Sequence, residues 1–210
     1  HGLNRNIFHP LDKTNEELQK FKKHLSKGKD CDFMLLFNSR NIRRKSISDT
    51  ILAWKLFLDE LTPEKRDKCT LVLHTEPVSD GNIVISADKL STEQMNMMYN
   101  CADGVILISS AEGWGLALTE SLLTGTPFIA NVTGGMQDQM RFEDEDGNWI
   151  DFNKDIPSNH RGTYTKHGKW VLPTFPTNLS LVGSPVTPYI YDDRCSFEDA
   201  ALRIQEMYEM

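Results

Sequence analysis

The sequence of 210 residues lacks the features that mark several protein classes. It has no apolar run near the roughly 20 residues that span a bilayer, and its first residues carry no apolar signal segment. No internal repeat or low-complexity tract is present. We therefore expect a cytoplasmic, soluble protein without a transmembrane segment, while peripheral membrane association of a longer protein stays open.

The chain has only four cysteines, and its 30 acidic residues outnumber its 23 lysines and arginines. The four cysteines are widely spaced, with no Cys-x-x-Cys pair and no histidines at metal-ligand spacing, so we expect free thiols, as in a reducing compartment. The formal net charge of −7 argues against a nucleic-acid partner. The acidic run from Glu143 to Asp146 lacks the spacing of a calcium loop, and we expect a solvated loop there and no metal site.

The basic residues are unevenly distributed. Arg40, Arg43, Arg44 and Lys45 follow a short apolar run within a few positions of one another. On a solvated face such a cluster is unremarkable, whereas at the end of a strand it would suit a phosphate. The cluster by itself leaves both interpretations open.

Short apolar runs alternate with amphipathic stretches, which is the pattern of a parallel sheet flanked by helices. The predicted strands are residues 33–37, 70–74, 83–85, 105–108 and 128–130, and the predicted helices are 47–61, 91–100, 116–123 and 196–208. We predict one Rossmann-like α/β domain over residues 1–210, with helices on both faces of its sheet. Residues 144–191 are rich in Pro, Gly, Asn and aromatics, and we expect an irregular excursion over the surface.

Several residues receive a structural interpretation at this stage. The aromatics of the excursion could form a sugar platform, but we favour a small local core; they are Trp149, Trp170, Phe175 and Tyr189. Asp192-Asp193-Arg194 is expected to be a solvated turn. The scattered histidines are expected on the surface or at strand ends; they are His9, His24, His74, His160 and His167.

The segment from Ser109 to Leu116 follows a predicted strand and opens a predicted helix. Free backbone amides and the helix dipole favour an anion at such a place. Gly113 and Gly115 would let the backbone approach that anion closely. The segment therefore indicates a phosphate site, although it matches neither the dinucleotide fingerprint nor the Walker loop.

Two carboxylates accompany this turn. Glu112 lies in it, and Glu120 lies eight positions later, roughly two helical turns away on the same side. Glu112 would face a ligand, and Glu120 could accept hydrogen bonds from sugar hydroxyls. The alternative is that Glu112 only favours the helix N-terminus and that Glu120 is exposed to solvent.

The segment from Glu112 to Gly135 resembles the Glu-x7-Glu motif and the following strand of the family 4 retaining glycosyltransferases, which have the GT-B fold. Gly125-Thr126-Pro127 and Gly134-Gly135 agree with that pattern, whereas Trp114 stands where Phe or Tyr is commoner. Further similar segments occur in the same order, so that the resemblance covers about residues 1–140; they are Gly2-Leu3-Asn4 with Phe8 and Pro10, Asn38-Ser39-Arg40 through Lys45, and Leu90-Ser91, Tyr99 and Ala102-Asp103.

The resemblance implies a nucleotide diphosphate sugar as donor substrate, with no metal and no other cofactor. It implies that Arg40 and Lys45 neutralise the diphosphate, that Glu112 holds the donor sugar and that Glu120 holds the ribose. Arg40, Lys45 and Glu112 would be the catalytic residues. The remaining donor-binding residues would be Ser91, Gly113, Trp114, Gly115 and Leu116.

The resemblance also implies that this chain is the carboxyl-terminal half of the enzyme. An amino-terminal domain outside the sequence would bind the acceptor sugar or glycan, so we expect this chain alone to bind donor and to be inactive in transfer. Two alternatives remain, a non-catalytic nucleotide-sugar-binding module and a nucleotide-sugar epimerase of the same architecture. A nicotinamide-dependent oxidoreductase is disfavoured because the dinucleotide fingerprint is missing.

Overall fold

The computed structural model describes residues 3–75, 83–153 and 159–210, and Gly2 of the resemblance lies outside them. At its centre is a six-stranded sheet in the order β3-β2-β1-β4-β5-β6, in which every neighbouring pair is parallel. The strands are β1 (Phe33–Asn38), β2 (Cys69–His74), β3 (Ile83–Ser86), β4 (Gly104–Leu107), β5 (Phe128–Asn131) and β6 (Val171–Thr174). This arrangement confirms the predicted Rossmann-like α/β fold.

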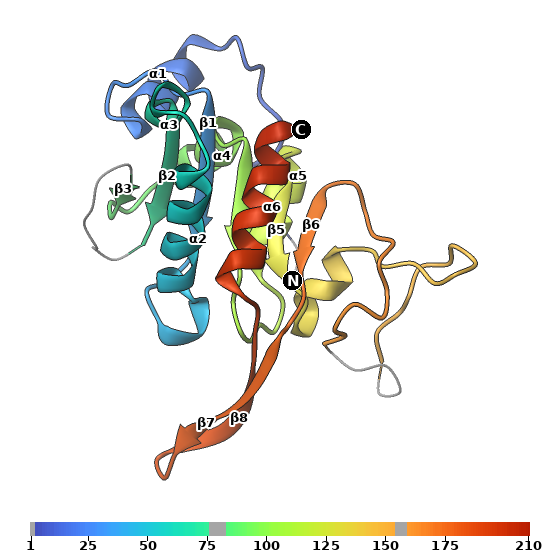
Figure 1. Cartoon of the computed structure of the whole chain (residues 1–210). Coiled ribbons are helices and arrows are strands. Elements are labelled where there is room, and N and C mark those ends of the chain that lie inside the picture. Colours follow the sequence, from blue (N-terminus) through green and yellow to red (C-terminus); the bar gives the residue numbers. More distant parts are fainter. Residues whose placement is uncertain (1–2, 76–82, 154–158) are drawn as a thin grey trace.

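Helices cover both faces of the sheet (Figure 1). Helices α2 (Ile47–Asp59) and α6 (Phe197–Glu209) pack against each other on one face, and α1 (Glu16–Leu25), α4 (Thr92–Cys101) and α5 (Leu116–Thr124) lie on the other. The short elements are α3 (Pro63–Asp67) and the 3-10 segments η1 (Arg43–Lys45) and η2 (Gly134–Gln139).

An aromatic cluster joins α2 and α6 to the sheet. The ring of Phe33 in β1 lies 6.2 Å from that of Trp54 and 5.7 Å from that of Phe57, both in α2. Tyr208 of α6 lies 5.4 Å from the same phenylalanine. Side chains of this size bury large apolar areas. The cluster therefore fixes two helices over the central strand and leaves the carboxyl ends of the strands free.

Local sequence signals mark several helix ends. Ser91 and Gln94 form a capping box at the start of α4, and Gly125 adopts a left-handed φ of 75° after α5. Pro63 follows α2 and begins α3, where a missing N–H costs nothing. Helix α1 was not predicted, although the side chain of Asn15 caps it.

In the predicted irregular excursion over residues 144–191, the described residues up to Trp170 form isolated bridges but no helix or strand. Beyond it, β6 pairs with β5 at the edge of the sheet, and β7 (Asn178–Ser184) and β8 (Thr187–Arg194) form an antiparallel hairpin that projects from the body (Figure 1). Strand β6 has only four residues and contains Pro173, which an edge position tolerates. In β7, Ser and Gly between the apolar residues weaken the strand pattern.

The expected solvated turn at Asp192-Asp193-Arg194 is wrong, because these residues belong to β8. The side chain of Asp192 is fully buried and forms an ion pair with Arg43, at 2.6 Å between Oδ2 and Nη1. Asp193 is also buried and accepts a hydrogen bond of 2.8 Å from the hydroxyl of Thr133. Their partners are distant in the sequence, so local polarity could not reveal the burial.

The aromatic residues of the excursion do not share one environment. Trp170 and Phe175 pack partly buried against the core, whereas Trp149 and Tyr189 are 62% and 63% exposed. His160 is buried, contrary to the expectation of a surface position, and its ring centroid lies 4.3 Å from that of Phe142. Burial in this apolar cluster lowers the pKa of His160 to about 4.

We expect the buried histidine to make the fold sensitive to acid. In the unfolded chain the imidazole of His160 binds a proton below its ordinary pKa of 6.5. In the folded chain the buried imidazole binds that proton only below a pKa of about 4. The free energy of unfolding should therefore fall from pH 6.5 downward, by at most about 3 kcal/mol. Urea titrations at pH 7 and pH 4.5 measure this loss. The loss should shrink in His160→Phe and persist in the exposed control His24→Asn; an equal loss in both variants would contradict the assignment.

Candidate functional site

A cleft opens where the chain leaves β1 and β4 at the carboxyl edge of the sheet. These strands are neighbours, but β1 leads toward β2 on one side and β4 toward β5 on the other, so the loops after them diverge. The cleft between the loops has a volume of about 1160 Å³. Of the predicted site residues, it is lined by Arg40, Lys45, Glu112, Trp114, Gly115, Leu116 and Glu120.

Gly113 and Ser91 have other positions. Gly113 lines a second hollow next to the cleft. The hydroxyl of Ser91 accepts a hydrogen bond of 3.2 Å from the amide of Gln94 and so caps α4, outside the residues that line the cleft. A donor-binding role of Ser91 stays a prediction.

Glu112 connects the basic loop, which runs from Arg40 to Lys45, to the turn before α5. Its side chain is only 7% exposed and forms ion pairs with Lys45 and with Arg44, the latter at 3.0 Å. Arg44 also donates a hydrogen bond of 2.7 Å to the carbonyl of Ala111. Sequence reasoning noted Arg44 in the basic cluster but did not select it for the site, where the structure places it.

Arg40 differs from its basic neighbours. It is exposed, lines the cleft and makes no hydrogen bond or ion pair through its side chain with any residue in the described ranges. Lys45, in contrast, is already paired with Glu112. The charge of Arg40 is therefore available to an anion in the cleft.

The glycines after β5 allow two loops to touch through their backbones. A Cβ atom on Gly134 would overlap with the carbonyl oxygen of Glu112, and one on Gly135 would overlap with that of Gly113. The amide of Gly135 donates a hydrogen bond of 3.3 Å to the Glu112 carbonyl. This contact holds the turn before α5 in place, with the first residues of the helix at the wall of the cleft.

Trp114 is fixed by a ring of hydrogen bonds. Its indole Nε1 donates to the hydroxyl of Thr119 at 2.8 Å, and that hydroxyl donates to Oε1 of Gln139 at 2.8 Å. The amide nitrogen of Gln139 returns a hydrogen bond of 2.6 Å to the carbonyl of Trp114. No pattern in the sequence pointed to Thr119 or Gln139.

Glu120 lines the cleft from α5 and ends a hydrogen-bonded chain. The amide of Asn38 donates to the hydroxyl of Tyr99 at 2.8 Å, and this hydroxyl donates to Oε2 of Glu120 at 2.6 Å. Burial raises the pKa of Glu120 although the bond from Tyr99 opposes the shift, and burial together with the Glu120 charge raises the pKa of Tyr99 well above its usual range. The carboxylate is thus held at the cleft rather than on the outer surface.

The cysteines are free, as predicted. Cys69 and Cys101 are buried, and burial raises the pKa of each thiol to about 12, so both are inert at neutral pH. Cys31 and Cys195 are partly buried. In the part of the chain that the structure describes, no helix combines the length and the apolar character needed to cross a membrane.

Known proteins share the fold. Across 99% of this chain, the Anabaena protein Alr3699/HepE, solved with UDP, has a TM-score of 0.60 at 15% identity, and the sucrose-phosphate synthase of Thermosynechococcus elongatus has 0.58 at 19%. This chain spans 46% and 42% of those two proteins. The C-terminal domain of LpcC, a glycosyl transferase group 1 family protein from Francisella tularensis, has a TM-score of 0.53 at 17% identity, covering 75% of this chain and 82% of that one.

Comparisons of the sequence identify the family. A search of curated proteins found no match. The family model described as glycosyl transferases group 1 matches residues 16–159, which is more than half of the chain and includes both glutamates of the cleft. This chain belongs to the group 1 glycosyl transferases.

Proposed function

We propose that the cleft binds a nucleotide diphosphate sugar and that this chain is the donor-binding half of a retaining glycosyltransferase. The observation that carries the proposal is the meeting of Arg40, the basic loop and the first turn of α5 around one cleft. Cations and free helix amides together suit a diphosphate. One neighbour in fold, the Anabaena protein Alr3699/HepE, was solved with UDP and with UDP-glucose, so a uridine nucleotide is the first candidate.

The chemistry assigns a role to each charged side chain. When the bond between sugar and diphosphate breaks, negative charge accumulates on the leaving group. Arg40, Lys45 and the amides of α5 would stabilise that charge, so that the proposed reaction requires no metal. Glu112 would face the donor sugar, with Arg44 and Lys45 fixing its carboxylate.

Glu120 would hold the ribose. Its carboxylate keeps acceptor capacity beside the bond from Tyr99, because an ionised carboxylate offers about four lone-pair positions. The two hydroxyls of a ribose are donors that such a group binds well. The positions of Glu112 in the turn before α5 and of Glu120 in α5 would then place the sugar and the ribose on either side of the diphosphate.

The acceptor is proposed to bind mainly to a further domain. The chain spans less than half of HepE and of sucrose-phosphate synthase, whose activities belong to whole proteins. We propose that this chain by itself binds donor without transferring sugar efficiently, and that the enzyme works in the cytoplasm.

A thermal-shift panel tests the function. UDP-glucose, GDP-mannose and ADP-glucose are compared, each with its free nucleoside as control. A ligand at 100 times its dissociation constant adds about 2.7 kcal/mol to stability, which is a visible shift. We expect one nucleotide sugar to stabilise the chain; the absence of a shift with all three would contradict the proposal.

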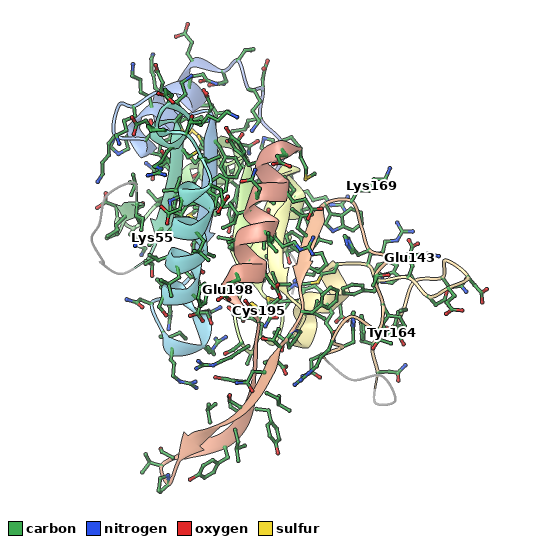
Figure 2. The ribbon with its side chains drawn as sticks, in the orientation of Figure 1. Lys55, Glu143, Tyr164, Lys169, Cys195 and Glu198 are labelled. Carbon is green, nitrogen blue, oxygen red and sulfur yellow. The ribbon has the colours of Figure 1, made fainter. Side chains whose placement is uncertain are left out.

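The unpaired cation provides a sharper prediction. Arg40→Ala should weaken the binding of UDP by about 10-fold to 100-fold, because a charge-assisted hydrogen bond contributes about 1.5–3 kcal/mol. Uridine should bind both proteins alike. The matched control is Lys55→Ala, which removes an exposed cation of α2 that does not line the cleft (Figure 2). Calorimetric titrations measure the affinity of the wild type and both variants for UDP and for uridine. If Arg40→Ala weakens the binding of both ligands equally, Arg40 does not contact the diphosphate.

A further inference from the structure

The hairpin of β7 and β8 forms one wall of a second hollow. This hollow has a volume of about 630 Å³ and lies directly beside the donor cleft, because Arg44 and Glu112 line both. Glu112 is therefore shared by the two spaces. A molecule in the second hollow would lie next to the group to which we assign the donor sugar.

The lining of the hollow combines apolar and polar side chains. The hairpin supplies Leu179, Ile190 and Tyr191, which are 43%, 47% and 63% exposed. Asp193, the cross-strand partner of Leu179 in the same hairpin, also lines the hollow, together with Asn159, whose amide donates a hydrogen bond to the Asp193 carboxylate. No charged residue occurs between Phe175 and Tyr191, although a quarter of the whole chain is charged. Such a wall suits an uncharged ligand with one apolar face.

The base of the hairpin is fixed to the donor site. The amide of Asp193 donates a hydrogen bond of 2.8 Å to the carbonyl of Ser110, and Asn131 donates one of 2.7 Å to the carbonyl of Asp193. The preceding residue, Asp192, forms an ion pair of 2.6 Å with Arg43 and so connects the hairpin to the basic loop. The apolar wall therefore keeps a set position relative to Glu112.

We propose that this hollow is a saccharide subsite that holds the acceptor sugar. A sugar ring presents C–H groups on one face and hydroxyls at its rim. An aromatic ring such as Tyr191 contacts the C–H face, while a carboxylate and an amide exchange hydrogen bonds with the hydroxyls. The inference rests on the proposed donor site, and it assigns part of acceptor recognition to this chain rather than to another domain alone.

Two tyrosines of β8 provide a matched test. Tyr191 lines the hollow, whereas Tyr189 lies two residues away, is also 63% exposed and is not among the lining residues. Saturation-transfer NMR is recorded with methyl α-glucoside, methyl α-mannoside and methyl β-galactoside, on the chain saturated with UDP. We expect transfer to at least one glycoside in the wild type and in Tyr189→Ala, and a decrease of about fivefold in Tyr191→Ala. Leu179→Ser should lower the signal as well.

The outcomes are separable from those of the donor site. UDP affinity should be equal in all variants, since none of the exchanged side chains lines the donor cleft. The subsite is overturned if no glycoside receives saturation, if Tyr191→Ala equals Tyr189→Ala, or if UDP displaces the glycoside. A wild-type dimer that Tyr191→Ala dissociates would make the hairpin a subunit contact and would also overturn it. Failure of UDP to bind contradicts the proposed function instead, and the glycoside spectra without UDP then decide the subsite.

Discussion

Gly134→Ala is expected to abolish UDP binding and to lower the free energy of unfolding by about 2–4 kcal/mol. The new methyl group would overlap with the carbonyl of Glu112, and the φ of Gly134 is 49°, which alanine adopts only with strain. Backbone atoms cannot rotate away as a side chain can. The turn before α5 must therefore move, and with it the first amides of the helix.

The matched control is Gly113→Ala in the same turn. A Cβ atom there meets nothing within 4 Å, and the residue has no left-handed φ. Urea titration and calorimetry with UDP on both variants measure the effect. If Gly134→Ala binds UDP as well as Gly113→Ala does, the contact between the two loops does not position the phosphate site.

Glu112→Gln should affect binding of the donor sugar but not binding of the nucleoside diphosphate. The substitution leaves the charges of Arg44 and Lys45 without their carboxylate, so UDP should bind as well as before or more tightly. The affinity for UDP-glucose should fall by about 10-fold to 100-fold relative to the affinity for UDP, because a hydrogen bond from the sugar to a charged group is removed. Calorimetry with both ligands measures the ratio; equal weakening of the two would contradict contact with the sugar.

Glu120→Gln is the comparison variant in this experiment and should weaken UDP and UDP-glucose alike. Its amide offers fewer acceptor positions and presents a donor where ribose hydroxyls also donate. It also faces the hydroxyl of Tyr99, which now donates to the carboxylate at 2.6 Å. If both variants bind both ligands as the wild type does, the glutamates have only a structural role.

Much of the fold could be predicted from local pattern. The strands β1 and β2 are continuous apolar runs because both faces of a parallel sheet are covered. The capping box at Ser91 and the glycine after α5 mark helix ends by chemistry that acts within four residues. Strand β6 escaped prediction because it is short, contains proline and becomes a strand only by pairing with β5.

The candidate site shows the same division. Spacing along one turn and helix drew attention to Glu112 and Glu120, since both lie in a single segment, and their proposed roles come from the family resemblance. The pairing of Glu112 with Arg44, and the support of Trp114 by Gln139, connect residues from different loops. Burial of Asp192 likewise depends on Arg43, which lies 149 positions away. No local pattern encodes such contacts.

The most direct test of the account is to map UDP onto the chain by amide NMR. The account predicts that UDP shifts the resonances of the basic loop from Arg40 to Lys45 and of the turn from Gly113 to Ala117. It predicts little change in α1 and in the hairpin of β7 and β8, which do not line the donor cleft. Shifts that gather away from these two loops, or no shifts at millimolar UDP, would contradict the claim that this cleft binds the donor.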